Sequence, residues 1–264
     1  MKVSWPIGVG LLALVILFPI DCQAQKPFQS SGATTLAQQQ AFLTVEEYAA
    51  LDEMFRVHMN YFLSPEVITA FGFPMTAYKV GNRARFGYSN PTEWGYAWQA
   101  WIAAAERGII PEGEAVGRLK RALTTLEALQ QDPKENYQGL PYPFYKMTTP
   151  DGEDLPAPYH DPYPEIPSGD NALLYASLVI IDGWGRKIGD EELWEQAERI
   201  RERMSFRMFL RQNGPCLYLA HTLNAKTGRL SPSNWDIYAD EGGVVTWIAY
   251  LSGSISFEEY KRLT

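Results

Sequence analysis

The sequence contains little that would build a metal centre or a disulfide framework. It has two cysteines and three scattered histidines in 264 residues. Cys22 lies in an apolar N-terminal segment, so only Cys216 remains beyond it, and one cysteine cannot form an internal disulfide. Because no Cys and His side chains cluster along the chain, we expect no metal site and no cofactor.

Basic residues are also few, and none of them cluster. Lys and Arg number 23 against 31 Asp and Glu, for a formal net charge of −8, which argues against a nucleic-acid partner. A hydrophobic content of 46% excludes a disordered chain. Eight Trp and 15 Tyr are more aromatic surface than a core of this size usually needs. We therefore expect one folded domain with an aromatic binding surface.

The N-terminal segment MKVSWPIGVGLLALVILFPIDCQAQ resembles a secretory signal peptide, with a basic start, an apolar run and a small-residue end at Ala24. An uncleaved membrane anchor is the rival interpretation, and Asp21 disfavours a lipoprotein attached through Cys22. We predict a signal peptide at 1–24, a flexible Gln-, Ser- and Thr-rich leader at 25–41, and one domain at 42–264. Removal of the signal predicts a secreted or periplasmic protein without stable membrane insertion.

Three helices are predicted to be apolar nearly all round, which requires burial. The first starts at Asn90-Pro91-Thr92-Glu93, where the cap, the proline and the glutamate are each at their favoured positions. The second starts at Ser168 as its cap, and the third follows the polar stretch SPSNWDIYADE. Helices with a charged face, the second of them capped by Asp190, follow the first two. Thr44 and Ser256 start two further helices through capping boxes.

Long Tyr- and Pro-rich connections separate these helical pairs, with one predicted β-hairpin turning at Pro150-Asp151-Gly152 and another at Lys226-Thr227-Gly228. Because the other links are short, buried and exposed helices alternate and run antiparallel. All the long loops then gather where the buried helices begin. The predicted fold is therefore all-α, an incomplete α/α toroid of helical hairpins with long loops and small β-hairpins at one end.

Carboxylates recur in the first turns of the three apolar helices, at Glu93, Asp170 and Glu241. Cleavage of a glycosidic bond needs one protonated and one ionised carboxyl group. We assign Glu241 as the acid, because an apolar surrounding raises a carboxyl pKa, and Asp236 or Asp170 as its ionised partner. The competing interpretation is that these carboxylates only complement helix N-termini, and Glu93 also completes the capping box.

Residues of the long loops and helix starts are candidates for sugar binding, because aromatic rings stack on the C–H faces of sugars and polar groups bind their hydroxyls. The alternative is a structural role, in which the rings pack the loops onto the helices. The candidate binding residues are Glu93, Trp94, Tyr145, Tyr159, His160, Tyr163, Asn171, Trp235 and Asp240.

Three stretches resemble a known family in the same order: NPTEWGYAWQAWIAAAERGII, IPSGDNALLYASLVII and NWDIYADEGGVVTWIAYLSG. They are similar to the glucoamylase-like α/α-toroid domain of cyclic β-1,2-glucan synthases and secreted endo-β-1,2-glucanases. GLPYPFYKMTTPDG resembles that family's Tyr-containing loop. The resemblance covers about Asn90 to Gly253, and it implies carboxylate-catalysed hydrolysis or transglycosylation of β-glucan in an aromatic cleft.

The resemblance aligns Glu241, Asp236 and Asp170 with acidic residues of the family. Glu93 departs from it, since the family has a neutral polar residue there, and Gly242-Gly243 replaces a small residue followed by arginine. A complete toroid also has more helices, and its second catalytic acid would lie beyond Thr264. We therefore expect a glycoside hydrolase or transglycosylase acting on β-glucan, with a non-catalytic glycan-binding or polysaccharide-assembly protein as the alternative. A helical protein-interaction scaffold is the third possible function.

Overall fold

The computed structural model describes residues 44–79, 84–214, 216–235 and 242–263. The predicted signal peptide and leader lie outside these residues. The chain divides into two compact units, residues 1–52 and 53–264. Helix α3 (Val45–Leu63) begins with the predicted capping box, in which the N–H of Glu47 donates to Oγ1 of Thr44 at 3.1 Å. Everything below concerns the second unit.

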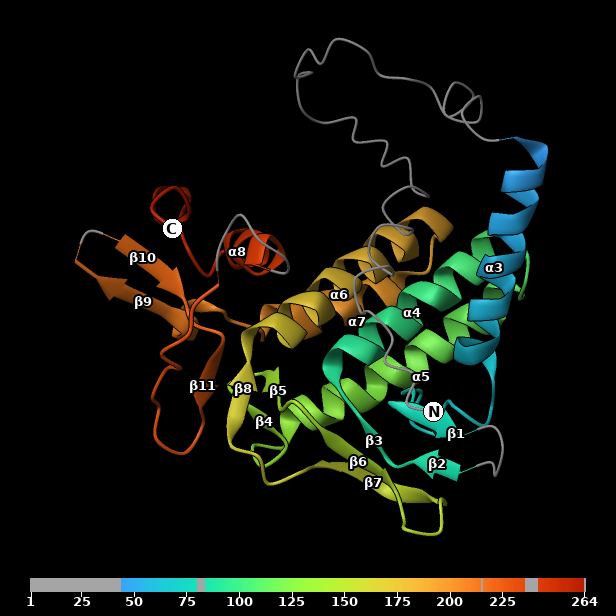
Figure 1. Ribbon diagram of the computed structural model, residues 1–264, viewed down its shortest axis with the longest axis horizontal. Coiled ribbons are helices and arrows are strands. Elements are labelled where there is room, and N and C mark those ends of the chain that lie inside the picture. Colours follow the sequence, from blue (N-terminus) through green and yellow to red (C-terminus); the bar gives the residue numbers. More distant parts are fainter. Residues whose placement is uncertain (1–43, 80–83, 215, 236–241, 264) are drawn as a thin grey trace. The chain divides into compact units, whose positions relative to one another are not determined.

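Four long helices form its centre: α4 (Pro91–Glu106), α5 (Glu112–Gln131), α6 (Ser168–Ile188) and α7 (Glu191–Glu202). Figure 1 shows these four helices lying side by side, and α4 packs on α6 while α5 packs on α7. The two apolar helices are thus neighbours, and each is followed by its charged partner. The predicted start of α7 is confirmed, because Oδ1 of Asp190 accepts from the N–H of Leu193 at 3.0 Å.

Tryptophans at helical spacing on α4 fill the core between the helices. Trp94, Trp98 and Trp101 have no exposed surface. The ring of Phe73, from the loop that precedes α4, stacks on Trp94 with 4.1 Å between centroids. Burial of rings of this size is a large source of stability, so these side chains anchor α4 in the core.

Within the described residues, five small antiparallel sheets accompany the helices, more than the two hairpins expected from the sequence. The three-stranded sheet has the order β3 (Tyr88–Ser89), β6 (Tyr145–Thr148), β7 (Asp154–His160), and β4 (Asn136–Tyr137) pairs with β5 (Leu140–Pro141). The remaining pairs are β8 (Glu165–Pro167) with β11 (Thr222–Asn224), β1 (Ala77–Lys79) with β2 (Ala84–Phe86), and β9 (Leu210–Asn213) with β10 (Cys216–Leu219).

Two of these sheets lead directly into the buried helices. Strand β3 ends just before α4, and β8 ends just before α6. Figure 1 shows β3, β6, β7 and β8 at the end of the helices where α4 and α6 begin. The sheets therefore fix the first turns of both helices, which carry the predicted acids.

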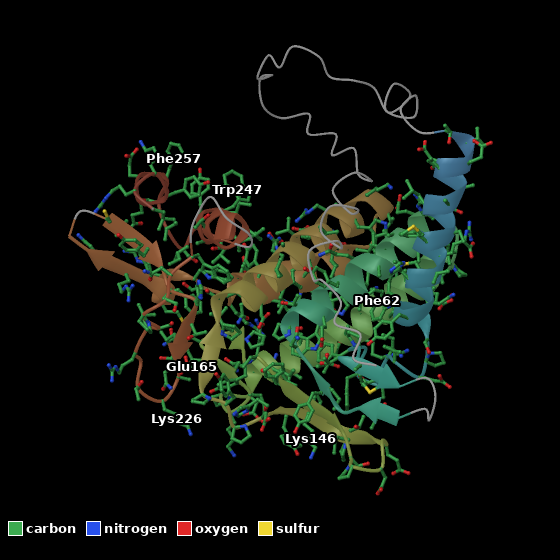
Figure 2. All side chains as sticks on the ribbon, in the orientation of Figure 1. Phe62, Lys146, Glu165, Lys226, Trp247 and Phe257 are labelled. Atoms are coloured by element: carbon green, nitrogen blue, oxygen red, sulfur yellow. The ribbon has the colours of Figure 1, made fainter. Side chains whose placement is uncertain are left out.

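Both predicted hairpins form, and one of them also pairs with a distant strand. Strands β6 and β7 pair around the turn at Pro150-Asp151-Gly152, as expected. The turn at Lys226-Thr227-Gly228 also forms as expected, since Leu223 pairs antiparallel with Leu230 and the N–H of Asn224 donates to the carbonyl oxygen of Arg229 at 2.9 Å. The sequence did not predict the further pairings of β9 with β10 and of β8 with β11. Glu165, labelled in Figure 2, stabilises the second pairing by accepting from Thr222 and Asn224. Strands β8 and β11 are distant in sequence, so a local hairpin pattern could not predict their pairing.

The third apolar helix, α8 (Gly242–Leu251), packs on α6 and is followed by α9 (Phe257–Tyr260), which starts with the predicted Ser256 capping box. Contrary to the expectation of full burial, Trp247 is 48% and Leu251 49% exposed. Trp247 and Phe257, both labelled in Figure 2, contact a common ring, that of Tyr250. A short 3₁₀ helix spans Arg207–Phe209. None of the described helices has the length and hydropathy of a membrane span.

The turn between β4 and β5 gives a prediction about stability. Gly139 has φ +83° and lies so close to Arg203 that a Cβ atom would clash with the carbonyl group of that residue. Gly108 has φ +66° with open space around it. We expect Gly139→Ala to lower the free energy of unfolding by more than about 3 kcal/mol, and Gly108→Ala, which adds backbone strain alone, by about 1 kcal/mol. Equal losses in chemical denaturation would contradict this close packing.

Candidate active site

Glu93 is held at the start of α4 by the predicted capping box, which is confirmed. Its N–H donates to Oδ1 of Asn90 at 2.9 Å, and its Oε2 accepts from the N–H of Asn90 at 3.0 Å. The hydroxyl of Thr76 also donates to Oε2, at 2.9 Å. One carboxylate oxygen is thus fixed by two donors from different segments, which gives the group a defined orientation.

Asp170 is in the first turn of α6 and is joined to α4 through a threonine. Oγ1 of Thr92 donates to Oδ1 of Asp170 at 2.6 Å, although the two residues are 78 positions apart. Thr92 directly precedes Glu93, so the two helix starts are in contact at their acidic ends. Glu93 and Asp170 are therefore brought to adjoining helix starts, whereas the predicted pairing of Asp170 with Glu241 falls outside the described residues. We define Glu93 and Asp170 as the acid pair.

Burial dominates the electrostatics of the acid pair. The pKa of Glu93 is raised to about 7. Desolvation is the largest cause and the charge of Asp170 a smaller one, and together they outweigh the hydrogen bonds from Thr76 and Asn90, which lower the pKa. Burial also raises the pKa of Asp170, against the lowering effect of the Thr92 hydrogen bond. A carboxyl group that changes protonation near neutral pH is suited to proton transfer.

The other predicted acids lie outside the described residues. Asp236 is the predicted ionised catalytic group, Asp240 a predicted sugar-binding residue and Glu241 the predicted acid. The described chain ends at Trp235 on one side of them and resumes at Gly242, the first residue of α8, on the other. Helix α8 packs on α6, which carries Asp170.

Three predicted sugar ligands are instead parts of the core. Trp94, Tyr145 and Asn171 have no exposed surface, so they present nothing to a sugar in this structure. The indole N–H of Trp94 donates to Ser89 at 2.8 Å, and Nδ2 of Asn171 donates to the carbonyl oxygens of Pro141 and Pro167. These side chains fix the loops around the acid pair, and the rings of Trp94 and Tyr145 pack 5.1 Å apart.

The remaining aromatic candidates of the β6–β7 hairpin are accessible. Tyr159 is 42% and Tyr163 54% exposed. His160, which lies between them in the sequence, is partly buried. His160 pairs with Tyr145 across the hairpin, whereas Tyr159 pairs with Lys146, which is labelled in Figure 2. Because neighbouring strand residues point to opposite faces, His160 is on the face of Tyr145 and Tyr159 is on the other.

Ser168 and Trp235 link the start of α6 to the second long connection. Ser168 is the first residue of α6 rather than its side-chain cap, because its hydroxyl donates to the carbonyl oxygens of Ala220 and His221. Nε1 of Trp235 donates to that hydroxyl at 2.7 Å, and the Trp235 ring lies 4.2 Å from the His221 ring. Trp235 is partly exposed. Its ring is therefore accessible, and it contacts Ser168, which lies two residues before Asp170 in α6.

Sequence reasoning missed four residues of this region: Thr76, Thr92, Glu135 and His221. Their roles depend on partners far along the chain, so local patterns carry no signal for them. A cavity of about 530 Å³ lies at the ends of α5 and α7, and it is lined by Gln130, Gln131, Pro133, Asn136, Tyr137, Gln138, Gly139 and Arg203. Within the part of the chain that the structure describes, no three Cys, His, Asp or Glu side chains are grouped to hold a metal ion.

Solved structures share this arrangement of elements. A glucoamylase-like protein from Bacteroides fragilis matches 84% of this chain with a TM-score of 0.56 at 14% sequence identity. A β-1,2-glucanase from Parabacteroides distasonis matches 83% with a TM-score of 0.56 at 18% identity. An endo-β-1,2-glucanase from Talaromyces funiculosus, solved with β-1,2-glucan, matches 84% with a TM-score of 0.52 at 11% identity. The chain has their fold.

The likeness is limited in two respects. The chain spans 48%, 29% and 51% of the lengths of these three structures, so it corresponds to about half or less of each. No protein-family model matches the sequence, and a search of curated proteins finds no match either. The fold resemblance to glucoamylase-like proteins and endo-β-1,2-glucanases is the one inferred from the sequence motifs.

Proposed function

We propose that this chain is a glycoside hydrolase-like protein that acts on β-glucan, with β-1,2-linked glucan as the first substrate to test. The acid pair carries this proposal, because two partly buried carboxyl groups from separate helices meet at the starts of α4 and α6. The fold of β-1,2-glucanases is consistent with it. We further propose that the helical hairpins are part of an α/α toroid and that the protein acts outside the cytoplasm.

The chemistry divides the carboxyl groups by protonation state. Glycoside hydrolysis requires one carboxyl to protonate the leaving oxygen and another, ionised, to activate water or attack the sugar. We assign Glu241 as the acid, Asp170 or Asp236 as the ionised group, and Glu93 as a ligand that exchanges a proton near neutral pH. Trp235, Asp240, His160, Tyr159 and Tyr163 complete the proposed sugar contacts.

The test is release of reducing ends from β-1,2-glucan by the purified chain and by Glu241→Gln. We expect product from the wild type and a loss of about a thousandfold in Glu241→Gln, because general acid catalysis contributes on this scale. Far-UV circular dichroism would show that both chains are folded. Equal rates for the two chains would contradict the assigned role of Glu241.

Non-catalytic glycan binding is the second candidate. The exposed rings of Tyr159 and Tyr163 favour it, because aromatic rings that stack on sugars bind a glycan without any catalytic group. Under this alternative, calorimetry would detect binding of β-1,2-glucan while the glucan remained intact. If the chain neither binds nor cleaves the glucan, both functions are contradicted and a protein-interaction scaffold is favoured.

A further inference from the structure

Glu135, in the connection that follows α5, makes contacts that tie it to the candidate site. Its Oε2 accepts from the backbone N–H of His160 at 2.6 Å and lies 3.1 Å from Nδ1 of the same residue. Both side chains are largely buried, at 17% and 24% side-chain exposure. An ionised carboxylate only accepts hydrogen bonds, so Nδ1 must carry the hydrogen. In the neutral imidazole, Nε2 is then an acceptor.

Tyr142 fixes the plane of the same imidazole. Its ring stacks on His160 with 4.1 Å between centroids and 15° between planes. One ring face and the Nδ1 edge of His160 are therefore covered by protein. Among the described residues no group hydrogen-bonds to Nε2, and the side chain retains some exposure. The exposed part of the ring must then belong to its other face and to the edge that carries Nε2.

Two contacts connect the segments that carry Glu135, His160 and Tyr142 with the first turns of α4 and α6. Pro141, next to Tyr142, accepts a hydrogen bond from Asn171, the residue after Asp170. Tyr145, which pairs with His160, packs its ring on Trp94, the residue after Glu93. Tyr145 also donates its hydroxyl to the backbone carbonyl of Glu135. The imidazole is thus held from the loops that build the candidate site.

We infer that Glu135 is a positioning residue that holds His160 as the Nδ1–H tautomer, so that Nε2 accepts a hydrogen bond from a sugar hydroxyl of the bound glucan. The inference rests on the proposed function for its ligand, and on the contacts of Glu135 for its geometry. A fixed tautomer and a fixed ring plane reduce the entropy that is lost when the sugar binds. An acceptor fixed in this way also discriminates against ligands that lack the matching hydroxyl.

The geometric part is tested without any ligand. Long-range ¹H–¹⁵N correlation spectra at pH 8 distinguish the two neutral tautomers of the three histidines, and His160→Ala assigns the signal. We expect His160 in the Nδ1–H form in the wild type and in Glu135→Gln, which keeps an oxygen acceptor. We expect a mixture rich in the Nε2–H form in Glu135→Leu. The Nε2–H form in the wild type would overturn the inference, even if Glu135→Leu did not fold.

The ligand part is tested by calorimetry with a β-1,2-linked gluco-oligosaccharide of defined length. We expect Glu135→Leu and His160→Ala each to weaken binding about tenfold, and Glu135→Gln to bind within about twofold of the wild type. The double variant Glu135→Leu/His160→Ala should be no weaker than His160→Ala alone, because Glu135 acts through His160. Additive losses would overturn the positioning role. A wild type that binds no oligosaccharide would refute the proposed function, while the tautomer result would still stand.

Discussion

Glu93→Gln is expected to become more stable than the wild-type chain, by up to about 3 kcal/mol, as the pH rises from 4.5 to above 7. Burial raises the pKa of Glu93 from 4.5 to about 7 in the folded state. Within this window the unfolded chain has released the proton and the folded chain has retained it. The contribution of Glu93 to stability is therefore complete below pH 4.5, is lost as the pH rises through about 7, and is constant above it. Gln cannot ionise, so the variant avoids this loss.

Chemical denaturation of both chains at several pH values between 4.5 and 8.5 measures this effect. Glu106, in the last turn of the same helix, provides a matched control of opposite sign. A hydrogen bond from Lys187 lowers the pKa of Glu106, so Glu106→Gln should lose stability relative to the wild type near neutral pH and regain it as the pH falls. A constant difference between Glu93→Gln and the wild type at every pH would show that Glu93 is an ordinary exposed cap.

Asp170→Asn is expected to reduce the turnover of β-1,2-glucan about a thousandfold while leaving the fold intact. Asn keeps an oxygen that can accept from Thr92, but it cannot act as an ionised base or nucleophile. The loss should appear in kcat more than in KM, because the ionised group acts in the chemical step. The measurement is the initial rate of reducing-end release over a range of glucan concentrations.

Asp190→Asn is the control for this experiment. Asp190 caps α7 and forms an ion pair with Lys120, so it too is a carboxylate at a helix start. Asn is an equally good cap, and none of the contacts of Asp190 reach the acid pair. We expect wild-type turnover from this variant. A loss of less than tenfold in folded Asp170→Asn would remove Asp170 from the proposed chemistry.

Local motifs allowed the helix starts to be predicted correctly. The capping boxes at Asn90 and Ser256 and the cap at Asp190 depend on side chains that bond to a backbone three positions away. The sequence therefore contains both partners. Ser168, like Ser256, is a serine at the start of a helix, but its hydroxyl donates to the carbonyl oxygens of Ala220 and His221 instead of capping the helix. That choice depends on a segment of the chain more than fifty positions away.

Side-chain exposure at the site could not be predicted in the same way. Trp94 and Tyr145 were candidates for sugar contact, yet both are buried. Phe73 covers Trp94, and the backbone of Glu135 accepts from the Tyr145 hydroxyl. Glu135 itself was missed because its partner, His160, is 25 positions away. Only the pairing of β6 with β7 and the return of the chain to α5 bring these groups together.

The most direct test of the central claim is the pKa of Glu93, measured by ¹³C NMR of its side-chain carboxyl in the wild type and in Asp170→Asn. If carboxyl groups from α4 and α6 meet in one buried site, the wild-type value will lie near 7. It will be lower in Asp170→Asn, yet still above 4.5, because burial is the larger cause and the charge of Asp170 the smaller one. A Glu93 that titrates near 4.5 in both chains would mean that the two acids face water separately, and the proposed site would not exist.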